Sequence, residues 1–528
     1  MTMDDPNPFQ IQIHDDAVAA VSSRVRHFYE AKQHFRIYHG STNSTRASRR
    51  YRDNTVDTSS LNHVLAVDVE KMTALVEPNV PMDALVDVTI GKFRLVPLVV
   101  MEFPGITVGG GFSGTSGESS SFRYGAFDTT INWIEIVLPN GEVTRAYRAE
   151  SEKSDLFWGA ASGFGTLGVV TLLEVQLKDA QPYVELTYSL HDLPDANALM
   201  RKQLETNSSS LDYIDGIVFS SKSTVVCSGR LASAPTPGSK VQRFSRSIDP
   251  WFYIHCRQLF KQLRSSPSQS ITEYVPLEDY LFRYDRGGFW VAKYSYHYFL
   301  VPFNRITRFI LNRLMHVRVM FRALHHSGLS DSYIVQDVGV PFDKVEEFTA
   351  WVDTALHITP LWLCPLRLVR ETTDAAHGLH SEFAHLPPDR AGLMNFGIWG
   401  PGSTDPREFV RQNQALERKV NELGGKKWLY AHAYYTEEEF WSHYDRKSYD
   451  AVRAKYGATW MPNVYDKVKT DYEAKERELQ KWVPWLLMLF WSIWPLRGLY
   501  GVFKAIMHRE YLLKRGNYSY TEKRGKKN

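Results

Sequence analysis

Residues 104–121 read PGITVGGGFSGTSGESSS, with six glycines among serine and threonine residues and one carboxylate, Glu118. Glycine lets the backbone come close to a ligand and adopt positive φ angles. Exposed backbone N–H groups in such a loop form concave binding sites for anions, typically phosphate. The stretch therefore predicts a loop that holds a large phosphate-bearing cofactor. A Gly/Ser loop without a ligand is the structural alternative.

The same stretch contains a G-x-G-x-x-G pattern at Gly109, Gly111 and Gly114, with Asp128 further along the chain. The βαβ dinucleotide-binding fold requires a hydrophobic strand directly before this pattern and a helix directly after it. The residues that follow, Thr-Ser-Gly-Glu-Ser-Ser-Ser, are poor helix formers. The context therefore disfavours a βαβ dinucleotide fold.

The composition is that of a globular protein with several domains. The chain has 528 residues, enough for about three domains. A net charge of +3 is too small to indicate a nucleic-acid partner, whereas 13% aromatic residues can supply an apolar pocket. The three cysteines, Cys227, Cys256 and Cys364, lie far apart and indicate neither a disulfide framework nor a zinc site.

Short helices and strands alternate along the chain, which predicts an α+β fold with mixed sheets. In the first 180 residues the expected elements are a helix at 17–33, strands at 35–38, 55–61, 64–69, 73–77 and 94–101, a helix at 83–88, a hairpin of 131–138 and 142–147, and a strand at 169–177. Helices are expected at 344–356 and 407–423, in a second α+β domain.

This order of motifs resembles the FAD-binding domain of the vanillyl-alcohol-oxidase superfamily, also called PCMH-type, over about residues 15–180. The segments that carry the resemblance are TVDTSSLNHVLAVDVEKMTALVEPNVPMDALV, PGITVGGGFSGTSGESSSFRYG, WIEIVLPNGEV, SDLFWGA and GFGTLGVVTLLEV. Further segments narrow it to the Δ24-sterol reductase family: GESSSFRYGAF, EYVPLEDYLFRYDRGGFW, YIVQDVGVP, PLWLCPLRL, LYAHAYYTEEEFW and YDAVRAKYGA.

The resemblance implies an FAD-binding domain of two α+β subdomains at residues 1–182. An α+β substrate or cap domain at 183–470 and a hydrophobic, basic tail at 471–528 would follow. The implied cofactor-binding residues are Gly40, Ser41, Thr42, Asn43, Ser44, Pro104, Gly105, Thr107, Val108, Gly109, Gly110, Gly111, Gly114, Thr115, Glu118, Ser119, Ser120, Ser121, Gly165, Thr166 and Gly168.

The resemblance also implies FAD as cofactor and NADPH as electron donor. His39 precedes Gly40 instead of following a glycine pair, which favours non-covalent FAD. The implied reaction is reduction of the Δ24 side-chain double bond of a sterol or triterpenoid, by protonation at carbon 24 and hydride delivery from reduced flavin. The alternatives are an FAD-dependent alcohol or aldonolactone oxidase, a side-chain double-bond isomerase, and a flavin-free membrane-associated binding protein.

The proton donor is sought in LYAHAYYTEEEFW. Alternation in a strand at 429–435 would place Tyr430, His432 and Tyr434 on one face, and Glu439 follows them. Structural hydrogen bonding is the alternative for the three aromatic side chains. A capping box formed by Thr436 and Glu439 is the alternative for the carboxylate.

Other charged and metal-binding residue types are expected to be structural. Asp285, Arg286 and Arg367 are further candidates, with ion pairing as their expected role. The remaining candidates are histidines without a companion Cys or acidic motif, which predicts surface positions and no metal: His325, His326, His377, His380 and His385.

Two segments predict contact with a membrane surface. Residues 482–496, WVPWLLMLFWSIWPL, are shorter than the roughly 20 residues needed to span a bilayer, and a basic tail follows them. A monotopic or re-entrant anchor is favoured over a spanning helix or a buried core helix. Residues 299–321 combine apolar and arginine side chains and are a second candidate, for which an ordinary solvated basic face over a core is the alternative and at least equally favoured. The N-terminus is too acidic and polar for a signal peptide, so with the resemblance we expect a cytosol-facing, peripheral protein of the endoplasmic reticulum membrane, of unspecified oligomeric state.

Overall fold

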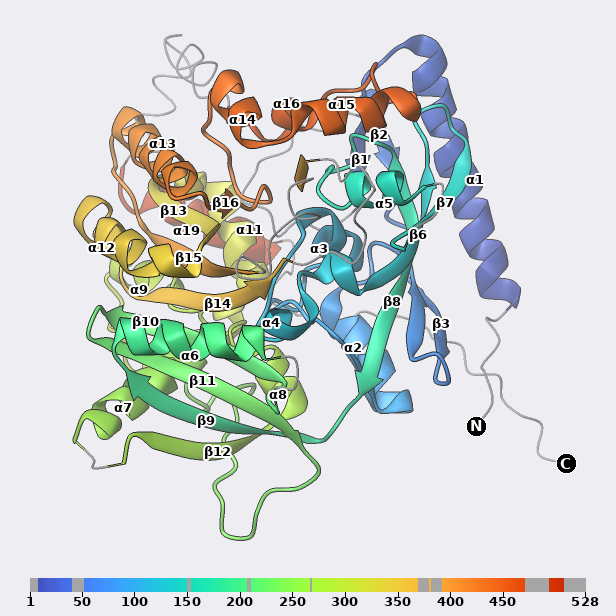
Figure 1. Ribbon diagram of the computed structural model, residues 1–528. Coiled ribbons are helices and arrows are strands. Elements are labelled where there is room, and N and C mark those ends of the chain that lie inside the picture. Colours follow the sequence, from blue (N-terminus) through green and yellow to red (C-terminus); the bar gives the residue numbers. More distant parts are fainter. Residues whose placement is uncertain are drawn as a thin grey trace, which may run out of the picture.

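The computed structural model describes residues 8–39, 52–149, 153–206, 210–265, 268–368, 379–380, 392–470 and 493–507. Two large sheets and one two-stranded sheet, with helices around them, make up these residues, which confirms the α+β class. In Figure 1 the first sheet, in blue and cyan, lies beside the second, in green to gold.

The first sheet is antiparallel, in the order β3-β4-β8-β6-β7, and β5 also pairs with β8. Its strands are β3 (Val64–Asp68), β4 (Thr73–Val76), β5 (Leu95–Pro97), β6 (Ile131–Val137), β7 (Val143–Tyr147) and β8 (Val169–Asp179). The predicted hairpin is confirmed, since Val137 pairs with Val143 across the turn. A parallel pair, β1 (Arg36–Tyr38) and β2 (Thr55–Asp57), lies apart from it. The helices of this part are α1 (Pro8–Ala31), α2 (Met82–Phe93), α3 (Val108–Gly114), α4 (Ser121–Tyr124) and α5 (Ser154–Ala160).

The glycine-rich stretch is not the uninterrupted loop that its composition predicts, because Val108–Gly114 forms α3. Thr107 caps this helix, its Oγ1 accepting the Gly110 N–H at 3.1 Å, and Val108 and Phe112 are fully buried. Thr115 ends it at a φ of 49°. Capping and burial of the two apolar side chains outweigh the low helix propensity of glycine.

The second sheet begins where β8 ends at Asp179 and β9 starts at Tyr183. Its order is β12-β9-β11-β10-β14-β15-β13-β16, and all its pairings are antiparallel. The strands are β9 (Tyr183–His191), β10 (Tyr213–Ser220), β11 (Ser223–Ala232), β12 (Ser270–Pro276), β13 (Tyr333–Val340), β14 (Leu361–Arg367), β15 (Gly392–Pro401) and β16 (Lys426–Lys427).

Helices cover this second sheet, and Figure 1 shows α6, α12 and α13 along it. They are α6 (Leu193–Glu205), α7 (Phe252–Ser265), α8 (Leu277–Leu281), α12 (Val345–Ala355) and α13 (Pro406–Glu422). The helices expected at 344–356 and 407–423 are thus confirmed. The near-continuous burial along β13 and β15 follows from this cover, since both faces of these strands are packed.

The stretch at 299–321 contains short helical elements. Gly501 of α19 lies against the backbone of Ala323 in α11, so the two helices pack closely. Arg497 reinforces the contact by donating to the backbone oxygens of Ser327 and Gly328, both at 2.5 Å. The helices in and around this region are α9 (Ala292–Tyr298), α10 (Arg305–Ile310), α11 (Val317–Ser327) and α19 (Leu496–Met507).

Most of the predicted anchor at 482–496 lies outside the described residues, which resume at Ile493. Within the described part of the chain, no helix combines the length and apolar character needed to cross a membrane.

The last helices return to the first domain, although the sequence places them in the second. Tyr449 donates its hydroxyl to Thr166 Oγ1 at 2.7 Å, and Lys455 pairs with Asp155 at 2.7 Å. These contacts draw residues 446–468 over the turn that precedes β8. The helices are α14 (Glu437–His443), α15 (Arg446–Lys455) and α16 (Val464–Val468).

A buried histidine fixes α1 to the first sheet. His14 lies 2.8 Å from Glu77 Oε1 and 3.2 Å from Glu135 Oε1. Burial alone would lower the pKa of His14, but hydrogen bonds and charge interactions with Glu135 and Glu77 outweigh it and raise the pKa to about 9. His14 is therefore a buried cation between two carboxylates at neutral pH.

We expect this site to make stability fall as the pH rises from about 6.5 to about 9. The unfolded chain releases the His14 proton near pH 6.5, whereas the folded chain keeps it until about pH 9. The His14 contribution, at most about 3 kcal/mol, is therefore complete below pH 6.5 and lost by pH 9. Urea unfolding at both pH values tests this: H14Q should lose most of the difference, and H27Q, at an exposed position on the same helix, should keep it. An H14Q profile like that of the wild type would contradict the assignment.

Candidate active site

One cavity of about 900 Å³ runs between the two sheets and their helices. One half is lined by the glycine-rich stretch, the turn before β8 and α16. The other half is lined by α9, α11, α19 and the strands β13 and β15. A concave site of this size can hold a large ligand, and two halves of different character suit two different ligands.

The first half has walls made largely of backbone. The Gly109 backbone lies so close to Pro78 that a Cβ would come within 2.7 Å of the proline Cβ. Gly165 has a φ of 73°, which side chains rarely adopt. Of the predicted cofactor-binding residues, those that line the cavity are Gly105, Thr107, Gly109, Gly110, Gly165 and Gly168.

Three lining residues of this half, Ser113, Ser116 and Gly117, were missing from the predicted set. They lie within the quoted stretch, but their position depends on α3. In a helix, residues four apart share a face, so Gly109 and Ser113 point the same way. Helical spacing would have identified Ser113 only if the helix had been expected.

The backbone N–H groups at the start of α3 are bonded within the protein. The N–H of Val108 donates to Val80 O at 2.9 Å, and that of Gly109 donates to Pro78 O at 2.8 Å. The Gly110 N–H donates to Thr107 Oγ1. These three amides therefore have acceptors within the protein, and phosphate binding by the rest of the stretch stays a prediction. Ser113 and Ser116, which carry hydroxyl groups, line the cavity wall.

The structure does not bring the remaining predicted residues of this stretch to the cavity. Ser119 Oγ accepts the Tyr280 hydroxyl at 3.2 Å, and Ser120 Oγ donates to Leu98 O at 2.8 Å. Ser121 Oγ accepts the Glu118 N–H at 2.8 Å. These hydroxyl groups stabilise the loop by hydrogen bonds within the protein. The predicted residues that are described but do not line the cavity are Pro104, Val108, Gly111, Gly114, Thr115, Glu118, Ser119, Ser120, Ser121 and Thr166.

Glu118 belongs to a buried ion cluster. Its carboxyl lies 3.3 Å from Arg283, whose guanidinium also donates to Asp215 at 2.9 Å. Burial raises the pKa of Glu118 to about 7, although Arg283 acts to lower it. The predicted turn at Gly40, Ser41, Thr42, Asn43 and Ser44 lies outside the described residues, and His39 before it lines the cavity.

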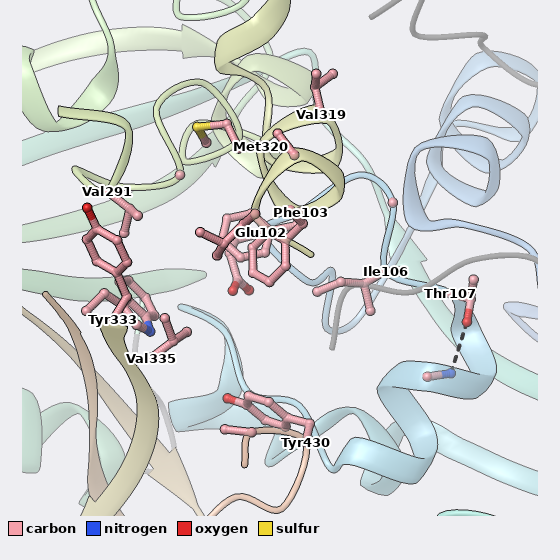
Figure 2. Close-up of a pocket in the computed structure, with 18 of the residues that line it drawn as sticks. Glu102, Phe103, Ile106, Thr107, Val291, Val319, Met320, Tyr333, Val335 and Tyr430 are labelled. Carbon is pink, nitrogen blue, oxygen red and sulfur yellow. Dashed lines mark hydrogen bonds between the residues drawn. The ribbon is translucent and has the colours of Figure 1, made fainter. Parts of the chain in front are cut away.

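The second half of the cavity is apolar and rich in aromatic rings. Figure 2 shows Tyr333 and Val335 on one side of the space, with Phe103 and Met320 across from them. Phe103 meets Phe289 edge to face, with ring centroids 5.8 Å apart. Such a wall suits a rigid hydrocarbon ligand, because burial of apolar surface supplies the binding energy. Further lining residues here are Val291, Tyr294, Val319, Leu324, Trp399, Leu499 and Val502.

The ionisable residues Glu102, Asp337 and Tyr430 line the cavity. Figure 2 shows the Glu102 carboxyl and the Tyr430 ring facing the same space. Burial raises the pKa of Asp337 to about 7, although hydrogen bonds from Tyr430, Trp399 and Asn395 act to lower it. Burial likewise raises the pKa of the Glu102 carboxyl well above its usual value. Cavity-lining carboxyls with raised pKa values are candidates for proton transfer.

The expected strand at 429–435 is wrong, because Leu429 and Tyr430 form a turn and Ala433 makes only an isolated β-bridge, to Lys469. The Glu417 carboxyl fixes it by accepting the Tyr434 N–H at 2.9 Å. Tyr430 consequently lines the cavity, whereas His432 and Tyr434 do not, and Tyr434 packs against Phe409 instead.

Glu439 is placed in the capping box that was the structural alternative. Thr436 Oγ1 accepts the Glu439 N–H, and the Glu439 carboxyl accepts the Thr436 N–H at 2.9 Å. The carboxyl also pairs with Arg418 at 2.8 Å, away from the cavity. Glu102 and Asp337 take its place as carboxyls on the cavity. The sequence carries one signal for Asp337, a charged residue inside the apolar run of 333–340.

The other charged candidates have structural contacts. Asp285 lies 2.5 Å from the His316 ring, and Arg286 donates to the backbone oxygens of Phe244 and Asp249. Arg367 donates to the backbone oxygen of Phe122 instead of forming the expected ion pair. In the ranges that the structure covers, no group of three His, Cys, Asp or Glu side chains could hold a metal ion.

Comparison with known proteins agrees with this architecture. Residues 16–147 match the family described as FAD binding domain. The chain is 30% identical over 467 residues to a Delta(24)-sterol reductase of Pisum sativum, covering 81% of this chain and 79% of that protein. It is 28% identical over 419 residues to the Homo sapiens Delta(24)-sterol reductase, covering 78% and 76%. The Caenorhabditis elegans Delta(24)-sterol reductase homolog dhcr-24 is 28% identical over 442 residues, covering 79% and 80%.

An FAD-binding domain whose cavity continues into an α+β cap defines an FAD-dependent oxidoreductase. More narrowly, the chain belongs to the Delta(24)-sterol reductase family, and the resemblance seen in its sequence is confirmed.

We expect G109A to weaken FAD binding at least tenfold, about 1.4 kcal/mol. The new methyl group would meet Pro78 at 2.7 Å and push α3 toward the cavity. The ratio of flavin to protein absorbance after titration with FAD measures this. The control is G91A on α2, where a Cβ meets nothing within 4 Å and flavin binding should be unchanged. Equal affinity of G109A and the wild type would show that this wall does not touch the cofactor.

Proposed function

We propose that the protein reduces the Δ24 side-chain double bond of a sterol or related triterpenoid, with non-covalent FAD and with NADPH as electron donor. The observation that carries this is the cavity of about 900 Å³, whose backbone-walled half continues into an aromatic, apolar half. Family membership supports the sterol substrate, because the relatives are named Delta(24)-sterol reductases. The residues fit the cofactor, since the glycine-walled half holds no bulky side chain from α3.

The reaction sets the demands on the protein. An isolated trisubstituted alkene is not polarised, so hydride adds only once a proton has reached carbon 24 and carbon 25 carries positive charge. The bound flavin supplies the hydride. The chain must hold the side chain of the substrate, exclude water and present an acid. The apolar wall meets the first two demands, and Tyr430 and the carboxyl groups beside it can meet the third.

We further propose that the protein rests on an anionic membrane surface, on the cytosolic face of the endoplasmic reticulum. The apolar face in question consists of Leu300 and Ile306, Phe309 and Ile310 of α10, together with Trp494, Leu499, Phe503 and Met507 at α19. Each of these side chains is at least half exposed. The two parts meet where Trp494 donates its indole N–H to Tyr298 O at 2.7 Å.

The charges of the residues around this apolar face also favour contact with an anionic membrane. The sequence between Asp285 and Asp331 has seven lysine or arginine residues and no carboxylate. Basic residues near a membrane surface each contribute about 1 kcal/mol of attraction to anionic lipid. Trp494, Leu499 and Val502 also line the cavity, so a sterol leaving the bilayer would reach the apolar half directly.

The reaction is tested with purified protein and FAD under anaerobic conditions. We expect NADPH to bleach the flavin, desmosterol to restore its absorbance, and the sterol product to gain two hydrogens by mass spectrometry. Acid precipitation should release the flavin into the supernatant, because it is not covalently bound. An unchanged sterol mass with shifted retention would instead indicate an isomerase. Flavin reduction by an alcohol and not by NADPH would indicate an oxidase, and absence of flavin binding would indicate a binding protein.

The membrane face is tested by flotation with vesicles that contain anionic phospholipid. We expect I306D/I310D to lower the bound fraction at least tenfold, since each buried isoleucine contributes about 1.5–3 kcal/mol. The control, I248D, places the same change at a side chain that is 52% exposed but far along the chain from this face. Unchanged binding of I306D/I310D would show that α10 does not contact lipid.

A further inference from the structure

We propose that Glu102 is the catalytic acid that protonates the substrate alkene, a role that rests on the reduction proposed above. Glu102 follows the buried run that ends at Met101, and it lies in the segment where the first domain meets the cap. The neighbouring Phe103 contacts Phe289 of the cap, and Gly105 lines the cofactor half. The Glu102 carboxyl is therefore next to both halves, and Figure 2 shows it pointing into the space between them.

Within the described ranges, no lysine or arginine forms an ion pair with Glu102. The nearby cation, Arg283, already contacts Asp215 at 2.9 Å and Glu118 at 3.3 Å. The basic residues that line the cavity are Arg36, His39 and Lys467, and none of them is among the strongest influences on Glu102; Lys467 donates to the backbone oxygen of Phe164 at 3.1 Å. A carboxyl in an apolar cavity without a cation is more stable as the neutral acid. A neutral carboxyl has the proton that the reaction needs.

The two other ionisable groups at this place are less suited to give up a proton. Tyr430 directs its hydroxyl to Asp337, and burial with the nearby Asp337 charge raises the pKa of Tyr430 well above its usual value. Asp337 receives hydrogen bonds from Tyr430, Trp399 and Asn395, which stabilise its charged form. Among the strongest influences on Glu102, the one hydrogen bond comes from its own backbone N–H, and no side-chain donor is among them. We therefore assign Tyr430 and Asp337 to positioning.

The charges around Glu102 act in the same direction as its burial. Burial is the largest influence that raises its pKa, and the carboxylates of Glu118 and Asp337 add to it. Arg283 opposes them only weakly, because its charge is shared with Asp215 and Glu118. Tyr430 and Cys364 also face this cluster, and burial keeps both neutral at physiological pH.

In the proposed step, the π electron pair of the alkene forms a new bond between carbon 24 and the Glu102 proton, and the O–H bond of Glu102 breaks. Carbon 25 is left with positive charge, which hydride from a bound reduced flavin would neutralise. The Glu102 carboxylate faces this charge across a water-poor cavity and stabilises it as it forms. A proton from solvent restores the acid, so each turnover consumes one NADPH and one proton.

The test separates the two half-reactions in E102Q. We expect NADPH to reduce its flavin within twofold of the wild-type rate, whereas reoxidation by desmosterol should slow at least about 100-fold, the lower range for loss of a general acid. Flavin content reports folding. A readout independent of turnover is the infrared carbonyl band of a protonated carboxylic acid. Both proteins are measured without FAD, and subtracting the E102Q spectrum from the wild-type spectrum should leave this band, because E102Q lacks the acid.

Two further variants sharpen the result. E102D keeps a carboxyl on a shorter side chain and should retain the infrared band with intermediate reoxidation, while E278Q, at an exposed glutamate of α8, should behave as wild type. Reoxidation of E102Q at the wild-type rate, or an unchanged infrared difference, would overturn the role of Glu102 and leave the proposed reduction intact. If reduced wild-type protein is not reoxidised by the sterol, the proposed reduction itself is overturned, and this role with it.

Discussion

The buried ion cluster of Arg283, Asp215 and Glu118 is the constraint on which the cavity depends. Arg283 follows α8 of the cap and has no solvent exposure, whereas Glu118 belongs to the glycine-rich stretch of the first domain. Asp215 on β10 accepts from Arg283 at 2.9 Å, from the Tyr284 hydroxyl at 2.6 Å and from the Trp362 indole at 3.0 Å. Loss of one member of such a buried pair costs about 3–5 kcal/mol, because it leaves an uncompensated charge. The cluster thus fixes the position of the first domain relative to the cap.

The same cluster shapes the chemistry of the cavity. Because Arg283 contacts Asp215 and Glu118, its charge lowers the pKa of Glu102 only weakly. The apolar walls formed by Phe103, Phe289 and their neighbours keep the surroundings poor in water. A low dielectric favours neutral carboxyls and strengthens the effect of any charge that develops in the cavity. Fold stability and acid chemistry therefore rely on one arrangement of charges.

The helices around the apolar half connect the cavity to the outside. Helix α19 packs on α11 through Gly501. Some of its other side chains line the cavity, and some belong to the exposed apolar face. Arg497 and Trp494 attach it to Ser327 and Tyr298 through backbone oxygens. These contacts place a segment remote in sequence at the apolar end of the cavity. A substrate that dissolves only in lipid would meet protein and bilayer at the same place.

Local pattern in the sequence determined the α+β class, the hairpin at 131–147, the helices at 345–355 and 406–422 and the capping box at Thr436, since each depends on neighbouring residues. Motif order determined the family. Only the tertiary structure decided which groups line the cavity. It placed α3 within the glycine-rich stretch, satisfied its first amides and turned Ser119, Ser120 and Ser121 away. It also separated Tyr430 from His432 and Tyr434, and brought Glu102 and Asp337 to one space from positions 235 residues apart in the sequence. The physical reason is that burial and partner choice come from contacts between distant segments, which spacing along the chain does not encode.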